Sequence, residues 1–413
     1  MTVDADSIES RSAADTDAGG TLSGVWADLV GQEAAVAVLR RAVASAANRA
    51  GAAAGHASGM THAWLITGPP GSGRSNAARA FAAALQCERQ GCGQCRSCRS
   101  VLAGSNPDVT LVRTEQLSLR VEQIRDLVLK AAMSPAVERW QVLVVEDADR
   151  LTEQAADALL KSLEEPPPRT VWVLCAPTVE DAVPTIRSRC RLLVLGTPST
   201  DAVARALQGR FGVDPAMATF AARASQGHIG RARALATNEE VRRRRQEVLS
   251  IPHRLTGVPA CLQAAQELID AAAAEAAATT SELDDPERGD LERALGIGTR
   301  GAPKPRHAQA ALKELDEQQK VRAKRLQRDA LDRALLDLVT YYRDVLTAAL
   351  DPTRELVNEE FRAEIEERAT RESPERALRA VDAILACREA VTANVAPLLA
   401  AETMLIALWR DDQ

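Results

Sequence analysis

A glycine-rich turn near residue 70 carries the residue types that bind phosphate groups. In the nucleotide-binding pattern G-x-x-x-x-G-K-[ST], glycines let backbone N–H groups surround the phosphates, the hydroxyl holds Mg²⁺ and the lysine reaches the β- and γ-phosphates. Gly68, Gly73 and Ser75 fit this pattern and Gly71 lies inside it, but Arg74 occupies the lysine position. The sequence therefore predicts a phosphate-binding loop with an altered basic residue. A plain Pro/Gly turn between a strand and a helix is the alternative.

Four cysteines follow this turn in the spacing C-x4-C-x2-C-x2-C, at Cys87, Cys92, Cys95 and Cys98. Four thiolates this close suit a structural Zn²⁺ ion in tetrahedral coordination, which leaves no open position for catalysis. An iron–sulfur cluster and unliganded thiols are the alternatives. The other four cysteines are scattered, and we expect them to be small buried apolar residues: Cys175, Cys190, Cys261 and Cys387.

Two carboxylates directly follow an apolar run at Gln141 to Val145, for which the pattern predicts a buried strand. In a phosphate-binding α/β fold, an Asp at this point holds Mg²⁺ and a Glu polarises the attacking water. Here Glu146 comes first and Asp147 second, so both carboxylates would be displaced from those positions. The alternative is that these acids cap the helix expected from Thr152.

Apolar runs alternate with helical patterns between residues 63 and 195, which predicts an α/β fold with a parallel sheet covered by helices on both faces. Helical periodicity continues from residue 198 onward. A Gly/Pro/Asp-rich segment at 278–306 interrupts it, and we expect this segment to form a surface loop. The expected strands are 63–67, 108–112, 141–145, 170–175 and 192–195.

The composition of the whole chain limits the classes of protein to which it can belong. With 413 residues, of which 46% are apolar, it is long enough for about three packed domains. Its net charge of -6 argues against a protein that coats nucleic acid electrostatically, and 3% aromatic residues leave few platforms for stacking bases. No apolar run approaches the ~18 residues of a membrane span, and residues 1–22 are small and acidic, as in a disordered tail. We expect no membrane contact and a cytoplasmic location.

Five stretches together resemble the bacterial DNA polymerase III clamp-loader subunits, which are AAA+ proteins: VWADLVGQ from Val25, HAWLITGPPGSGRS from His62, the four-cysteine segment, DALLKSLEEPPP from Asp157 and SRC from Ser188. The resemblance covers about residues 25–240. It implies a AAA+ P-loop domain with a parallel sheet, a small helical lid and an all-α C-terminal collar that joins subunits into a ring. The implied division is a tail at 1–22, a nucleotide-binding-type domain at 23–196 with a zinc knuckle at 87–98, a lid at 197–243, and a collar at 244–413 with a loop insertion near 278–306.

The chain departs from the ATP-hydrolysing pattern of this family. That pattern has a P-loop lysine, Asp-Glu after the strand that corresponds to 141–145 here, a polar sensor after the next strand and an arginine in the lid. Here the corresponding residues are Arg74, Glu146-Asp147, Ala176-Pro177 and Gly230, with Arg231 one place along. Because a planar guanidinium does not replace a point-charge ammonium in a tight loop, we expect ATP and Mg²⁺ to bind weakly or not at all.

ATP turnover should therefore be weak or absent, and the resemblance implies no polymerase activity in the chain itself. These departures make the chain look like the delta-prime type of clamp-loader subunit. The alternatives are the ATP-hydrolysing gamma or tau type and another AAA+ remodelling protein.

The SRC motif at Ser188, Arg189 and Cys190 is intact. In this family its arginine is a finger that reaches across a subunit interface to the γ-phosphate bound by a neighbour, where it stabilises charge in the transition state. The resemblance assigns that role to Arg189; the alternative is a surface arginine that caps a helix C-terminus. It also implies partners: the gamma/tau and delta subunits in a pentameric ring and, through the assembled complex, the sliding clamp and primer–template DNA.

Overall fold

This computed structural model describes residues 22–48, 59–113, 119–136, 139–295 and 306–410. The tail expected at 1–22 therefore lies, except for its last residue, outside the described residues. The chain divides into two compact units. The first ends at Pro198, and the second begins at Ser199 and also contains residues 113–120 and 150–152.

A five-stranded sheet with the strand order β2-β3-β4-β1-β5 forms the centre of the first unit. Every pairing in it is parallel. Three central strands are buried along their whole length because helices cover both faces, and their sequences are accordingly continuous apolar runs. The strands agree with the predicted ones to within one residue at each end and are β1 (Ala63–Thr67), β2 (Val109–Val112), β3 (Gln141–Val145), β4 (Thr170–Ala176) and β5 (Arg191–Val194).

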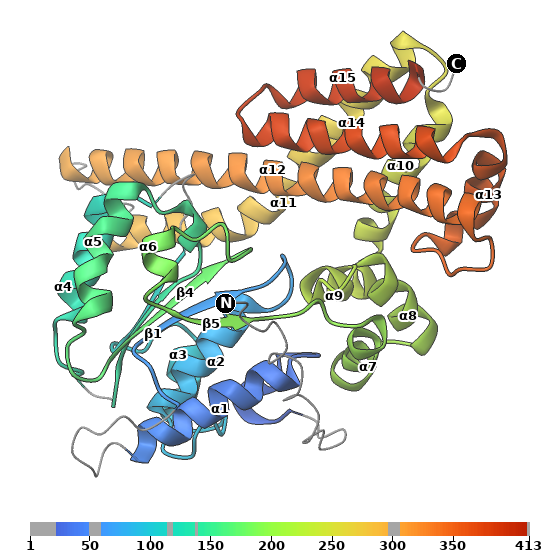
Figure 1. The fold of residues 1–413 in the computed structure, drawn as a ribbon. Helices are drawn as coiled ribbons and strands as arrows, with labels where there is room; N and C mark the ends of the chain where they lie inside the picture. The colour runs from blue at the N-terminus through green and yellow to red at the C-terminus, as the bar shows by residue number, and fades with distance from the viewer. Residues whose placement is uncertain (1–21, 49–58, 114–118, 137–138, 296–305, 411–413) are drawn as a thin grey trace, which may run out of the picture. The chain divides into compact units, whose positions relative to one another are not determined.

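Successive side chains of these strands point to opposite faces of the sheet. Trp64 and Ile66 of β1 join a core that also contains Leu39 of α1 and Phe81 of α2. Helices α1, α2 and α3 lie on this side of the sheet, and α4 and α5 pack together on the other (Figure 1). The helices of this unit are η1 (Gly24–Trp26), α1 (Glu33–Asn48), α2 (Arg74–Gln86), α3 (Arg96–Leu102), α4 (Val121–Ala131), η3 (Ala148–Arg150), α5 (Glu153–Glu164) and α6 (Pro184–Arg187).

The second unit is helical and contains two hydrophobic clusters. Helices α7 (Thr200–Phe211), α8 (Pro215–Ala224) and α9 (Ile229–Thr237) share a small core around Val203 and Leu235. A larger core, which includes Leu338 and Leu405, joins the remaining helices. They are α10 (Glu239–Arg254), α11 (Val258–Ala294), α12 (Arg306–Leu350), η4 (Glu359–Phe361), α13 (Arg362–Arg371), α14 (Pro374–Thr392) and α15 (Pro397–Arg410). The parallel sheet followed by helical regions confirms the predicted fold class, whereas the four-part division at residues 22, 196 and 243 stays a prediction.

The surface loop predicted at 278–306 is wrong for its first part. Helix α11 runs without interruption to Ala294, through Pro286; residues 296–305 lie outside the described residues. The segment lacks an apolar stripe because it is held to α12 by polar contacts. Arg288 Nη2 lies 2.9 Å from Asp316 Oδ1, and the amide of Gln319 donates a 3.3 Å hydrogen bond to the carbonyl of Asp284. Charge pairing between two helices leaves no period-3.6 hydrophobic signal in the sequence.

Candidate functional site

The glycine-rich turn connects β1 to α2, as a phosphate-binding loop does. Gly71 and Gly73 have φ angles of 85° and 94°, in the left-handed region that favours glycine. A side chain at Gly68 would place its Cβ 2.8 Å from the carbonyl oxygen of Leu195, so this position has no room for one. The loop thus keeps the backbone shape that its sequence predicts.

Gln32, a buried residue just before α1, holds this loop in place. Its Nε2 donates hydrogen bonds to the carbonyls of Gly196, at 2.7 Å, and Ser72, at 3.3 Å. Its Oε1 accepts a 3.2 Å hydrogen bond from the N–H of Gly196. Gln32 is not among the site residues predicted from the sequence. Its position within the VWADLVGQ stretch was the one signal that it could be part of the site.

Arg74 does not extend from the loop into open space. Its Nη1 donates a 2.6 Å hydrogen bond to the carbonyl of Gly68, at the start of the same loop. Burial lowers the pKa of the guanidinium, which remains charged at neutral pH. The positive charge is therefore used to close the loop on itself. Ser75, the expected Mg²⁺ ligand, is half-buried in the first turn of α2.

Glu146 follows β3 and is buried against α2, where it is bound by Arg79. The Nε and Nη2 atoms of Arg79 lie 3.1 and 2.8 Å from Oε1 of Glu146. The structure thus brings the carboxylate and the loop helix together, as the parallel sheet predicts, but its charge is neutralised by an arginine that the sequence analysis did not single out. Asp147 is half-buried beside it.

Arg231, the candidate lid arginine, is also bound within the chain. Its guanidinium forms an ion pair with Asp337 of α12, and both side chains are largely buried. Its backbone N–H donates a 3.2 Å hydrogen bond to Nδ1 of His228, which caps α9. Burial lowers the pKa of His228 and so favours the neutral ring that can accept this bond. Arg74, Glu146 and Arg231 thus all bind groups of this chain.

The SRC motif forms the turn between α6 and β5. Nη1 of Arg189 donates to the carbonyl of Thr185, at 2.9 Å, and to the hydroxyl of Ser188, at 3.2 Å. Its Nε donates a 2.6 Å hydrogen bond to Glu164, at the end of α5. The hydroxyl of Ser188 in turn donates to Thr185 at 3.0 Å. Burial raises the pKa of the Cys190 thiol to about 12, so this cysteine is not a nucleophile at neutral pH.

The SRC motif and the glycine-rich turn lie at opposite ends of the neighbouring strands β1 and β5. In the parallel pairing of β1 with β5, Trp64 is opposite Arg191 and Thr67 is opposite Val194. The glycine-rich turn follows the last residue of β1, whereas Arg189 precedes the first residue of β5. The length of a four-residue strand, on the order of 10 Å, separates the two strand ends. Arg189 and the glycine-rich turn of its own subunit therefore lie at opposite ends of these two strands.

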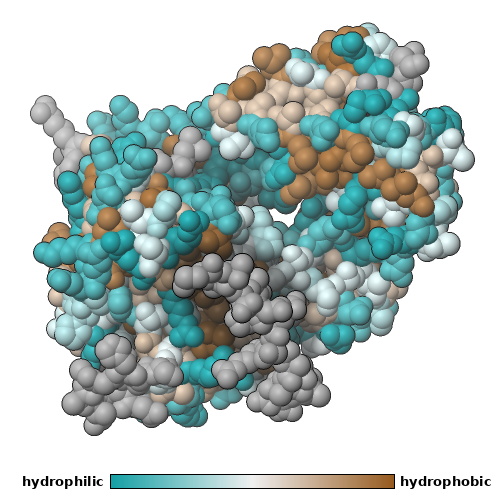
Figure 2. Space-filling model, viewed as in Figure 1, coloured by the Kyte–Doolittle hydropathy of each residue, from teal (hydrophilic) through white to brown (hydrophobic). Residues whose placement is uncertain are grey.

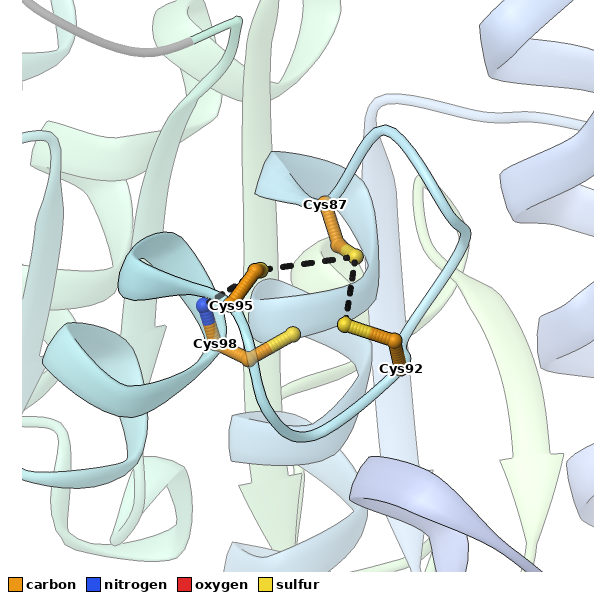
Figure 3. A group of neighbouring side chains, drawn as sticks. All are labelled: Cys87, Cys92, Cys95 and Cys98. Carbon is orange, nitrogen blue, oxygen red and sulfur yellow. Dashed lines mark hydrogen bonds between the residues drawn. The ribbon is translucent and has the colours of Figure 1, made fainter.

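The four clustered cysteines meet at the end of α2, on a turn that continues into α3 (Figure 3). Their Sγ atoms all lie within 4.8 Å of one another. The Cys87–Cys92 and Cys87–Cys95 Sγ distances are 3.6 and 3.7 Å. Tetrahedral zinc with Zn–S bonds of ~2.3 Å requires sulfur separations of about 3.8 Å. The cluster therefore fits a tetrahedral metal of this size.

The cysteine turn packs on the N-terminal segment. The N–H of Val25 donates a 3.1 Å hydrogen bond to the carbonyl of Gly91, and Trp26 is buried beside it. A Cβ on Gly91 would lie 2.8 Å from the Val25 side chain. Backbone hydrogen bonds from Gln94 and Cys95 lower the pKa of the Cys92 thiol to about 6, whereas burial raises the pKa of the Cys98 thiol. Of the remaining cysteines, Cys175, Cys261 and Cys387 are buried as predicted, whereas Cys190 is half-buried.

Part of this chain matches a family model and several curated proteins. Residues 52–199 match the family model described as "DNA polymerase III, delta subunit". The DNA polymerase III subunit delta' of Pseudomonas aeruginosa is 38% identical over 135 residues, which are 31% of this chain and 41% of that protein. The DNA polymerase III subunit tau of Bacillus subtilis is 35% identical over 137 residues, 32% of this chain and 24% of that protein. The chain thus spans less than half the length of these curated relatives.

Among solved structures, a DNA polymerase III gamma subunit-related protein from Thermotoga maritima aligns with a TM-score of 0.36 and 17% identity. The alignment covers 85% of this chain and 94% of that one.

Proposed function

We propose that this chain acts as the delta-prime subunit of a DNA polymerase III clamp loader, which the family match and the delta' relatives support. In this role it braces the loader ring and supplies Arg189 to the ATP site of a neighbouring subunit. The loader places the sliding clamp on primed DNA during replication. The chain itself hydrolyses little or no ATP.

The observation that carries this proposal is the opposite placement of the two phosphate-related features. Arg189 is partly exposed and lies before the N-terminal end of β5, whereas the glycine-rich turn of the same subunit follows the C-terminal end of β1. An arginine in that position can serve only a phosphate that another molecule holds. At the C-terminal ends of the strands, Arg74 is hydrogen-bonded to Gly68 and Glu146 is paired with Arg79. This combination favours a subunit that gives a catalytic group over one that hydrolyses its own nucleotide, and so favours delta-prime over gamma or tau.

The test is an Arg189→Ala variant reconstituted with the loader ATPase, the delta subunit, the clamp and primed DNA. Loss of one preorganised charge at a transition state lowers a rate on the order of 10²-fold or more. We expect a loss of this size at the neighbouring ATP site, measured by single-turnover hydrolysis. Arg187→Ala, which removes an exposed arginine two residues earlier, is the matched control and should leave the rate unchanged. Equal rates for Arg189→Ala and the unaltered chain would remove the finger role.

Assembly into a pentameric ring with gamma/tau and delta subunits is proposed to involve the C-terminal helices. Hydrophobic side chains appear on the surface that these helices form in Figure 2. On α14 and α15, Leu378, Leu385 and Leu399 are 48%, 37% and 56% exposed, and we propose that a neighbouring subunit covers them. Among the described residues, no helix has the length and apolar character needed to cross a membrane. We place the subunit in the cytoplasm with the replication machinery.

We also propose that the four clustered cysteines hold structural Zn²⁺. The sulfur separations fit tetrahedral coordination, and all four ligand positions are filled by the protein. Zinc bound there would supply a fixed cross-link between α2, the turn and α3, with no part in catalysis.

A further inference from the structure

The guanidinium of Arg189 is bound on both of its edges in the isolated chain. Glu164 accepts from Nε at 2.6 Å and forms an ion pair with Nη2. The other edge, Nη1, donates to the carbonyl of Thr185 and the hydroxyl of Ser188. The edge that faces Glu164 is the paired N–H fork with which an arginine binds a phosphate through two hydrogen bonds. The side chain that is proposed to act on a neighbour is therefore bound to a carboxylate of its own subunit.

We propose that Glu164 is a positioning residue for Arg189, which holds the guanidinium along the end of α5 until the triphosphate of a neighbouring subunit displaces it. This inference rests on the proposed finger role of Arg189. Thr185 and Ser188 lie one turn or less before Arg189, and their neutral oxygens bind Nη1 without competing for charge. Glu164 is the charged group in this set, so it sets the electrostatic cost of releasing the finger.

The ion pair is weak enough to be exchanged. The side chains of Arg189 and Glu164 are 34% and 48% exposed, so water screens their attraction and the pair is worth little in isolation. A triphosphate with Mg²⁺ presents several oxygens in place of one carboxylate, and its terminal phosphate gains charge in the transition state. The exchange therefore favours the bound, reacting nucleotide. In the unassembled subunit, the carboxylate keeps the guanidinium in one orientation and away from other anions.

The contact itself can be tested in the intact chain, without assembly. Phenylglyoxal modifies accessible, unpaired arginines, and mass spectrometry measures its rate at each site. For an exposed ion pair, removal of the carboxylate should speed modification of Arg189 by about two- to fivefold. We expect this for Glu164→Gln, and not for Glu165→Gln, which removes the neighbouring exposed carboxylate. The difference in the rate of Arg189 modification between Glu164→Gln and the unaltered chain should decrease as the salt concentration rises. Equal rates in all three chains at low salt would overturn the proposal.

The assembled loader then tests the consequence for catalysis. With Glu164→Gln, the finger no longer has to leave a charged partner, so single-turnover hydrolysis at the neighbouring site should rise by up to about fivefold at low salt. Glu164→Asp keeps the charge and should lie near the unaltered chain. An unchanged or lower rate for Glu164→Gln would contradict the proposal while leaving the finger role intact. A loader in which Arg189→Ala hydrolyses ATP normally would remove the finger role, whereas the phenylglyoxal result would still decide whether Glu164 holds Arg189.

Discussion

The guanidinium of Arg74 has the positive charge of a P-loop lysine but lies in a different place. An ammonium on a flexible stem can point into the loop, whereas the guanidinium here donates to the carbonyl of Gly68 and closes the loop. The neighbouring carboxylate is similarly engaged, because two nitrogens of Arg79 bind one oxygen of Glu146. At the level of single residues, the loop has the backbone shape of a phosphate-binding turn, while the charged groups beside it are bound within the chain.

Restoring the lysine alone should not restore ATP hydrolysis. In an Arg74→Lys variant, the loop charge can again reach phosphates, so binding of Mg-ATP is expected to tighten. Turnover should stay at background, because Glu146 is neutralised by Arg79 and the Glu-Asp order is still reversed. Phosphate release by the purified chain, with Mg-ATP and primed DNA, measures this. Robust turnover from this single change would contradict our account of the site and favour the gamma or tau alternative.

At the scale of elements, the sequence predicted the sheet well and the polar connections poorly. Buried parallel strands are continuous apolar runs, so all five strands could be found from local pattern. The partners of Arg79, Gln32 and Arg189 lie 67, 164 and 25 residues away in the chain, and no local pattern encodes such pairs. The end of α11 was mistaken for a loop for the same reason, since its side chains pair with those of another helix.

The four-cysteine turn gives a prediction at this scale, because η1 and α3 both depend on it. Removal of the metal with a chelator should lower the melting temperature by about 4–8 °C, for a loss of roughly 2 kcal/mol in a domain of this size. Hydrogen exchange measured by mass spectrometry should accelerate in residues 22–32 and 87–102, which share the contact of Gly91 with Val25. Helix α8, in the other unit, is the internal control and should not change.

Re-addition of Zn²⁺ should restore both the melting temperature and the exchange pattern, and re-addition of Mg²⁺ should restore neither. Protein that contains no zinc on metal analysis, with eight titratable thiols, would exclude the metal site. Iron and inorganic sulfide in place of zinc would favour an iron–sulfur cluster.

At the scale of the whole molecule, the two helical groups of the second unit are joined by buried charges. Asp337 of α12 pairs with Arg231 of α9 and lies 3.3 Å from Nε of Arg245 in α10, whose side chain is only 3% exposed. Arg245 also binds Asn358 and Glu360. Displacement of one partner from this network would leave a buried charge uncompensated, which is strongly destabilising.

Asp337→Asn should therefore destabilise the second unit by about 3 kcal/mol, the usual cost of breaking a buried ion pair from one side. Urea unfolding followed by circular dichroism measures the change. Asp332→Asn is the matched control on the same helix. Its pair with Arg388 is 30% to 45% exposed, and the expected loss is under about 1 kcal/mol. Equal losses for the two variants would mean that the Asp337 network contributes no more than a surface pair.

The opposite placement of Arg189 and the altered loop also determines how many ATP sites a mixed assembly would contain. With the finger role proposed for Arg189, each copy of this chain in a row of subunits would complete one ATP site of a neighbour and, because its own loop lacks the lysine, would form no working site itself. A row made only of such copies would contain no working site at any junction. The number of active sites in a ring would equal the number of lysine-bearing subunits whose neighbour supplies an arginine finger. This chain would therefore mark the point at which the series of hydrolysing subunits stops.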